Sequence, residues 1–346
     1  MTRLRLLLLM AGAGTLLAGL PATAAVHADP SVGATVGEAR ALQLLSAASR
    51  AARTRVYSGT QYVSTWRAET ASSSVADVEH TSDGRSLISV HPTAGGVVDS
   101  TLTLTTDLDA RLVALLAQHY DLSVAPDVTC NGRPAHVVEA TRQGAPGQVA
   151  GRFWIDADSA LLLRREVFDQ AGRLVRSSAF ANIEVEGTSI PSVEAAASAP
   201  DRLSSDALDR LRADGWQIPA TLPGELELFD ARLRTHEGER VLHLSYSDGL
   251  STLSLFAQRG RLGTARMAGF TKQKLGGAAI WVRPTSPERV VWGGGGRVFT
   301  LLSDAPPEAV HAVVTTLPHE KLPKTGIVAR LQRGLARLGS WLNPFD

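Results

Sequence analysis

The sequence predicts an α+β protein, with an N-terminal antiparallel sheet covered by helices and a smaller C-terminal antiparallel β domain that has a helix. Residues 152–185 indicate three strands joined by tight turns at 156–159 and 169–172, where Asp, Ser and Gly favour turns. An alanine-rich segment at 32–55 has apolar residues at helical spacing, and further strand patterns follow a stretch rich in Pro, Ser and Ala.

The N-terminus predicts export. Arg3 and Arg5 precede an apolar run over residues 6–20, and small residues at 22–24 and 26–28 offer cleavage sites. This is the three-part pattern of a secretory signal peptide, which we place at residues 1–28. The alternative is an uncleaved anchor, but the apolar run is shorter than the roughly 20 residues that a spanning helix needs. We therefore expect an exported protein, periplasmic or otherwise extracytoplasmic and associated with the cell envelope.

Composition limits the function classes. The formal net charge is +1, so no bulk attraction to nucleic acid is expected. Cys130 is the only cysteine, which excludes an internal disulfide and leaves either a small buried side chain or an intermolecular link. The chain is long enough for two domains of roughly 100–200 residues each.

The first domain is expected over residues 37–187. Its predicted helices span 37–55, with Ala41, Leu44, Leu45 and Ala48 on one face, and 107–120, with Asp107 as the N-cap. The predicted strands and hairpins cover 56–67, 75–81, 85–90, 97–106, 129–142 and the three strands of 152–185.

A linker is expected over residues 188–214, with a short helix at 205–213, and a second domain over 215–318. Its predicted strands are 226–235, 239–247, 250–258, 278–283, 288–292 and 297–303, and a helix at 306–316 closes it. The glycines at 293–296 could suggest a phosphate loop. A strand follows them instead of a helix N-terminus, which favours a hairpin tip.

The tail, residues 319–346, predicts a basic amphipathic helix. Apolar residues from Val328 to Leu342 recur at spacings of three and four, and Arg330, Arg333 and Arg337 lie on another side. Such a helix can dock on the protein itself, on a partner or on an anionic membrane surface. Residues 322–326 read LPKTG, a sortase-type signal, but the arginines that follow do not fit the required membrane span.

No catalytic motif is present, so no enzyme, cofactor or metal site is expected. Asp156 and Asp158 form a carboxylate pair, but their position in a hairpin turn favours a turn-forming role. His243 in a strand and His311 in a helix are interpreted as structural. An exported enzyme stays open as an alternative, because catalytic groups converge in space and not in sequence.

Several segments resemble the RseB/MucB family in order and spacing. They are FWID followed by LLLRR and a D-x-x-G turn in 153–185, Tyr57-Ser58-Gly59-Thr60, Trp216 before Ile218-Pro219, and HLSYSDGLSTLSLF at 243–256. The ending SWLNPF at 340–345 resembles the tail of actinobacterial members. The resemblance covers roughly residues 38–320, whereas the basic tail and the LPKTG string depart from the better-known proteobacterial pattern.

The resemblance implies a fold and a function. The first domain would be a half-barrel like that of lipoprotein carriers such as LolA, a curved sheet with helices over its concave side. The protein would be an exported negative regulator of an extracytoplasmic-function sigma factor in the envelope stress response. It would bind the extracytoplasmic segment of a transmembrane anti-sigma factor, protect that segment from proteolysis and release it on binding a lipid or acyl chain. The alternative is an envelope lipid or lipoprotein carrier.

Two groups of residues are candidates for these roles. For the partner we expect Trp216 and the loop Asp248, Gly249 and Leu250 to lie at the domain junction. Filling the core is the alternative for each bulky side chain, because strand alternation sends about half of them to each face. The candidates for a lipid cavity are Tyr57, Tyr62, Trp66, Phe153, Trp154, Phe168 and Phe180.

Overall fold

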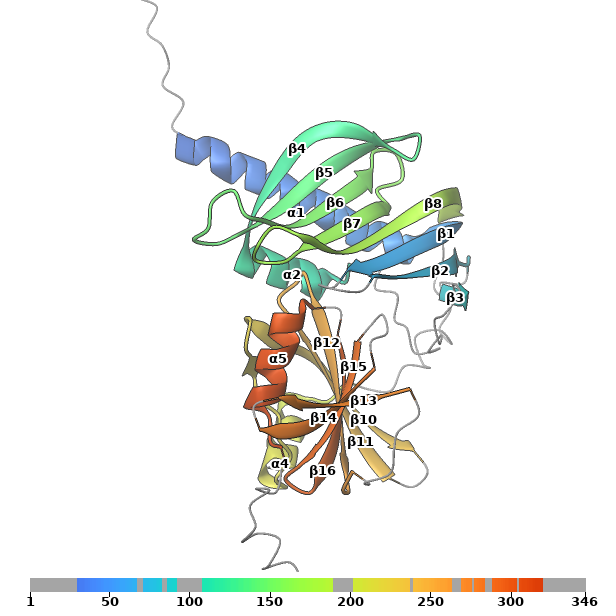
Figure 1. Cartoon of the computed structure of the whole chain (residues 1–346). Coiled ribbons are helices and arrows are strands. Elements are labelled where there is room, and N and C mark those ends of the chain that lie inside the picture. The colour runs from blue at the N-terminus through green and yellow to red at the C-terminus, as the bar shows by residue number, and fades with distance from the viewer. Residues whose placement is uncertain are drawn as a thin grey trace, which may run out of the picture.

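The computed structural model contains two eight-stranded antiparallel sheets, one in each half of the chain (Figure 1). The predicted signal peptide, the strand at 97–106, residues 189–201 of the linker and residues 320–346 of the tail, with LPKTG, lie outside the described residues. The structure describes residues 30–66, 71–82, 86–91, 108–188, 202–236, 239–262, 269–275, 277–283, 288–303 and 305–319.

The first sheet has the strand order β3-β2-β1-β8-β7-β6-β5-β4. The predicted meander forms β6, β7 and β8, so neighbours in the sequence are neighbours in the sheet. Strands β3 and β4 lie at opposite edges of the sheet, and β8 pairs with β1 between them. The strands are β1 Arg55–Trp66, β2 Ala71–His80, β3 Ser86–His91, β4 Tyr120–Cys130, β5 Arg133–Arg142, β6 Val149–Asp156, β7 Leu162–Phe168 and β8 Leu174–Thr188.

Two helices cover one face of this sheet, α1 (Pro30–Thr54) and α2 (Ala110–His119). The apolar face predicted for the first helix is buried with Phe153 and Ile155 of β6 in one core cluster. One detail of the prediction is wrong. The N-cap of α2 is Asp109, whose carboxylate accepts a hydrogen bond from the Arg111 N–H at 3.2 Å, and not Asp107. Strand β4 starts directly after α2, well before the hairpin arm predicted at 129.

The second sheet has the order β13-β14-β15-β16-β12-β11-β10-β9. Helices α4 (Ser205–Ala213) and α5 (Pro307–Thr316) accompany it. The short strands β9 and β13 were not predicted. The strands are β9 Thr221–Leu222, β10 Leu226–His236, β11 Glu239–Ser247, β12 Thr252–Arg259, β13 Thr271–Leu275, β14 Ala278–Arg283, β15 Glu288–Gly294 and β16 Arg297–Ser303.

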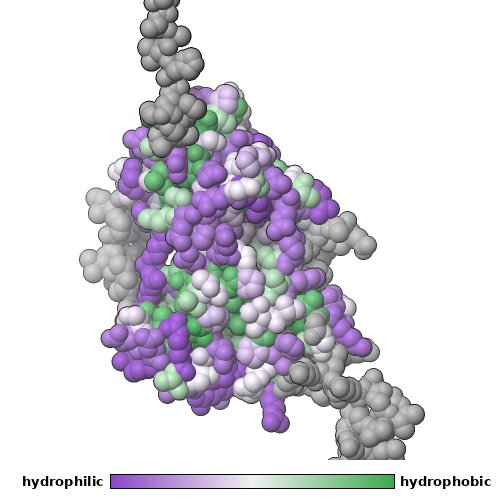
Figure 2. Space-filling view, turned by 90° about the vertical axis from the view of Figure 1, so that its left-hand side faces the viewer, coloured by the Kyte–Doolittle hydropathy of each residue, from purple (hydrophilic) through white to green (hydrophobic). Residues whose placement is uncertain are grey.

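The glycine-rich stretch is a hairpin tip, as predicted. Gly295 and Gly296 have φ values of 57° and 72° and connect β15 directly to β16. Gly294 is required for close packing, since a Cβ there would lie 2.1 Å from the Pro318 carbonyl oxygen. The core of this domain includes Trp292 stacked on Phe299 at 5.2 Å. Figure 2 shows a broad hydrophobic patch over the lower half of one face, where the second domain lies.

Local polar contacts fix the predicted turns. The Asp156 carboxylate accepts hydrogen bonds from the Ser159 N–H and hydroxyl and from Arg133. Burial alone would raise the pKa of Asp156, but these bonds outweigh it and lower the pKa below its ordinary value. Asp169 is held in the same way by Ala171 and Arg173. The turn-forming role predicted for Asp156 is confirmed.

Cys130 is a free, buried thiol whose pKa is raised by burial. In the ranges given above, none of the helices has the length and apolar character needed to cross a bilayer. Within those same ranges no three His, Cys, Asp or Glu side chains come together as metal ligands.

Candidate functional site at the domain junction

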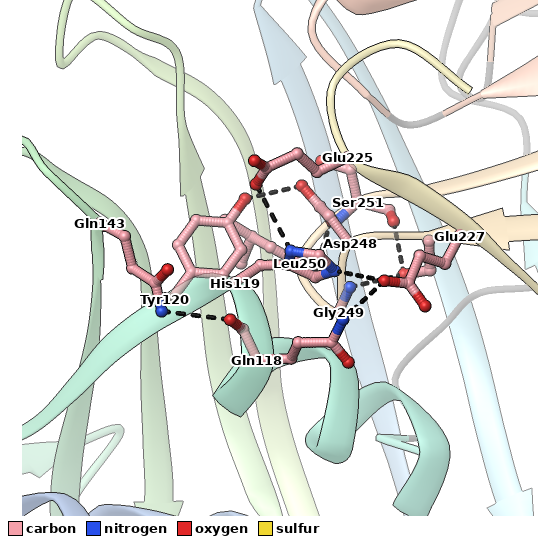
Figure 3. A network of polar contacts seen from close by, with 11 residues as sticks. Gln118, His119, Tyr120, Gln143, Glu225, Glu227, Asp248, Gly249, Leu250 and Ser251 are labelled. Carbon is pink, nitrogen blue, oxygen red and sulfur yellow. Dashed lines mark hydrogen bonds and ion pairs between the residues drawn. The ribbon is translucent and has the colours of Figure 1, made fainter. Parts of the chain in front are cut away.

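The two domains meet where the β11–β12 loop, residues 248–251, inserts between α2 and the first sheet (Figure 3). Three successive residues of this loop each make a different contact with the first domain. Asp248 forms a hydrogen bond, Gly249 packs against helix backbone and Leu250 enters the apolar core. We refer to residues 248–251 as the junction loop.

The Asp248 contact is a buried hydrogen bond. The Tyr120 hydroxyl donates to Asp248 Oδ2 at 2.6 Å, and the two residues are 5% and 9% exposed. Burial, followed by the nearby Asp248 carboxylate, raises the pKa of Tyr120, so the phenol stays protonated and keeps its donor. Asp248 Oδ1 accepts from the Leu250 and Ser251 N–H groups at 2.9 and 2.6 Å. One carboxylate therefore shapes the loop and binds the other domain.

The Gly249 contact depends on the absence of a side chain. Its φ is 89°, in the left-handed region that favours glycine. A Cβ there would lie 2.1 Å from the Leu116 nitrogen and 2.4 Å from the Leu116 Cα. The loop can approach α2 this closely only with glycine at this position.

The Leu250 contact places a side chain of the second domain in the core of the first. Leu250 is 2% exposed and belongs to the core cluster that contains Phe153 and Val167. Gly151 of β6 leaves room for it, because a Cβ on Gly151 would lie 2.3 Å from Leu250 Cδ1. The buried Arg165 guanidinium donates a hydrogen bond to the Leu250 carbonyl oxygen.

A polar rim borders these buried contacts. Gln118 Nε2 donates to Glu227 Oε1 at 2.6 Å, and His119 Nε2 lies 3.2 Å from the same oxygen. His119 Nδ1 lies 3.4 Å from Glu225 Oε2. The end of α2 is thus fastened to the start of β10 as well as to the junction loop.

A small cavity of about 70 Å³ lies beside the Tyr120–Asp248 bond. Both domains line it, the first with Arg142 and Phe168 and the second with Glu308. A cavity needs roughly 10–15 Å³ of space of this kind to hold one water, so this cavity has room for a few waters. The arrangement joins α2 of the first domain to the start of β10 and to the junction loop of the second.

The seven lipid-cavity candidates are divided between the two faces of the first sheet. Tyr57, Phe153 and Phe180 are buried on the face that α1 and α2 cover. Tyr62 and Trp66 alternate with the buried residues of β1 and are 49% and 37% exposed.

The other two candidates also alternate with buried residues of their strands. Trp154 is half-buried between the Arg152 and Arg164 guanidiniums, at 5.8 and 4.9 Å from its ring. Phe168 lies near Arg152 and lines the junction cavity. The seven side chains therefore do not form one lining, because strand alternation separates them.

The partner candidates need one correction. Trp216 is not at the junction. It is 3% exposed in the core of the second domain, beside α4 and under Arg259 and Arg297. Figure 1 shows α4 at the end of the second domain away from the first. Strand β12 runs from the junction loop to Arg259, so the two candidate sites lie at opposite ends of this strand. Asp248, Gly249 and Leu250 do lie at the junction, where their contacts are made within the chain.

Comparison with known proteins supports the family resemblance. Residues 93–203 match the family model described as the MucB/RseB N-terminal domain. The resemblance to the MucB/RseB family is therefore confirmed over this segment. No curated protein matches the chain significantly.

Three solved structures are similar to larger parts of the chain. The complex of Pseudomonas aeruginosa MucA/MucB is 20% identical, with a TM-score of 0.41 over 82% of this chain and 99% of that one. A structure of MucB is 19% identical, with a TM-score of 0.43 over 81% and 98%. A LolA superfamily protein from Nitrosomonas europaea is 10% identical, with a TM-score of 0.19 over 78% and 96%.

Proposed function

We propose that this protein is an exported regulator that binds the extracytoplasmic segment of a transmembrane anti-sigma factor and protects that segment from proteolysis. The observation that carries the proposal is the match of residues 93–203 to the MucB/RseB N-terminal domain. The junction supports it, because the Tyr120–Asp248 bond and the buried Leu250 join the two domains, so one partner can contact both.

The test begins with the gene beside the one that encodes this chain. A single-span protein with a cytoplasmic anti-sigma domain is expected there, and its extracytoplasmic segment is the probe. We expect calorimetric binding of the purified segment and slower cleavage of the segment by a site-specific protease when the protein is present. Binding without protection would reject the protective role. If the protein is crosslinked and captured from cells together with lipids or lipoproteins only, the alternative function of a lipid or lipoprotein carrier would be favoured.

Release of the partner by a lipid is a separate part of the proposal. A lipid between sheet and helices would contact the candidates on the covered face, Tyr57, Phe153 and Phe180. It would favour release only through a higher affinity for the partner-free state. Titrating delipidated and lipid-loaded protein with the same segment measures this difference, and equal affinities would reject the lipid switch.

A further inference from the structure

Strand β13 is an edge of the second sheet. Among the described strands, Thr271–Leu275 pairs only with β14, so one side of its backbone has no strand partner. An edge strand presents N–H and C=O groups that can pair with another extended chain. Peptide recognition by strand addition uses this kind of edge.

A groove lies beside β13 on the side facing α5. Its volume is about 140 Å³, and its lining joins aliphatic side chains, among them Leu275, Val282, Val310 and Val314, with the polar residues Thr271, Gln273, Glu288 and His311. An enclosed cavity of roughly 150 Å³ lined by Leu, Ile and Phe accommodates a benzene ring. The groove therefore has room for one aliphatic or aromatic side chain.

The other face of β13 is basic. Lys272 and Lys274 alternate with the groove-lining residues, both are exposed, and they are two of only four lysines in the chain. Lys272 lies 5.6 Å from the Trp281 ring, and neither lysine forms an ion pair with an acidic residue in the described part of the chain. This positive charge is available to an incoming chain.

We propose that β13 and the groove bind an extended peptide segment in which apolar and acidic residues alternate. A strand added beside β13 directs successive side chains to opposite faces. Its apolar residues then lie over the groove and its acidic residues lie beside Lys272 and Lys274. The inference rests on the proposed function, since it assigns this surface to the anti-sigma segment.

Edge lysines also have a protective role, because they discourage pairing between edges and aggregation. The two roles make different predictions. Protection predicts that removing the lysine charge promotes aggregation with no effect on peptide affinity. Recognition predicts a loss of affinity for acidic strands together with a gain for basic ones.

The experiment compares two short synthetic peptides, one alternating valine and glutamate and one alternating valine and lysine, by fluorescence anisotropy on the full-length protein. We expect the glutamate peptide to bind more tightly. Lys272→Glu with Lys274→Glu should weaken its binding about tenfold and reverse the preference. The matched control is Arg234→Glu with Arg240→Glu, the same charge change on exposed residues of the β10–β11 hairpin at the other end of the sheet, and it should leave both affinities within about twofold.

Equal binding of the glutamate peptide by the wild type and the Lys272→Glu, Lys274→Glu variant would overturn the inference. So would an equal loss of affinity in the control. The anti-sigma segment then separates the two proposals. If that segment binds the wild type and the lysine variant equally, the proposed function stands and the assignment of β13 fails. If it binds neither while the glutamate peptide behaves as expected, the strand-binding surface stands and the proposed function fails.

Discussion

Replacing Gly249 by alanine should detach the junction loop from the first domain. The new Cβ would lie 2.1 Å from the Leu116 nitrogen, 2.4 Å from its Cα and 2.7 Å from the Leu112 carbonyl oxygen, all of them helix backbone that cannot rotate away. The loop has to withdraw, which separates Asp248 from Tyr120 and moves Leu250 out of the core. Losing the burial of one leucine costs about 1.5–3 kcal/mol, and an unsatisfied buried partner adds about 1–3 kcal/mol.

Part of the effect comes from backbone strain alone, and a second glycine isolates it. Gly277 in the same domain has a φ of 81°, close to the 89° of Gly249, but a Cβ there meets no atom within 4 Å. Gly277→Ala should therefore cost only the left-handed strain of about 1–2 kcal/mol. The difference between the two variants measures the junction itself, and we expect at least ~2 kcal/mol.

Urea denaturation followed by tryptophan fluorescence gives the free energy of unfolding of each variant. Small-angle scattering reports whether the domains separate in the folded state. We expect a lower free energy and a larger radius of gyration for Gly249→Ala than for Gly277→Ala. If both variants lose the same stability and scatter like the wild type, the contact with α2 does not hold the domains together and the reasoning is refuted.

The remaining predictions concern the buried pair, one histidine and the tail. Tyr120→Phe should cost about 1–3 kcal/mol of unfolding free energy, because the buried Asp248 Oδ2 loses the donor that Tyr120 supplies; a double-mutant cycle with Asp248→Asn measures the coupling, and purely additive costs would contradict it. Burial lowers the pKa of His243 to about 4 from 6.5, so the unfolded chain binds more protons between these values and stability should fall, by at most ~3 kcal/mol, as the pH drops from about 6.5 to 4. This loss of stability should be absent in His243→Gln. If the stability of that variant falls with pH as much as that of the wild type, the loss belongs to other groups. Truncation after His319 should abolish binding to vesicles containing anionic lipid if the basic tail attaches the protein to membranes, and unchanged co-sedimentation would exclude that role.

Local signals in the sequence predicted most of the fold. Turns such as 156–159 and 169–172 are stabilised by their own side chains, so their residues alone predict them. The N-cap of α2 was assigned to the wrong residue because Asp107 and Asp109 can both cap a helix. Only the position at which the helix begins, Ala110, decides between them. Strand β9 has only two residues, and β13, TKQKL, is polar except for its last residue, so neither shows the alternating apolar pattern that indicates a strand.

The candidate site could be predicted only in part, because its contacts join residues distant in the sequence. Tyr120 and Asp248 are 128 positions apart, and nothing local marks Tyr120 as the partner of a carboxylate. The presence of an aromatic residue in a strand also does not show on which side of the sheet its side chain lies. Tyr57 and Tyr62 look equivalent in the sequence, but they are separated by an odd number of positions and therefore face opposite sides of β1.

The S-D-G-L motif illustrates how a sequence signal can be real while its interpretation changes. The sequence indicated residues 248–250 as a surface for a partner protein. In the structure, Ser247 shapes the loop through hydrogen bonds with Gly249 and Ser251, and the next three residues bind the first domain. Each residue type is explained by a contact within the chain, so the motif needs no external partner to account for it.

This assignment changes how partner-binding data on the motif should be interpreted. Substitutions at Asp248 or Leu250 are expected to weaken binding of a partner that contacts both domains, even if the partner never touches the loop, because they release one domain from the other. A substitution at Lys272 or Lys274 leaves the junction intact and removes only the local charge. Measuring the radius of gyration together with the affinity separates the two cases, since a junction variant changes both and an edge-strand variant changes the affinity alone.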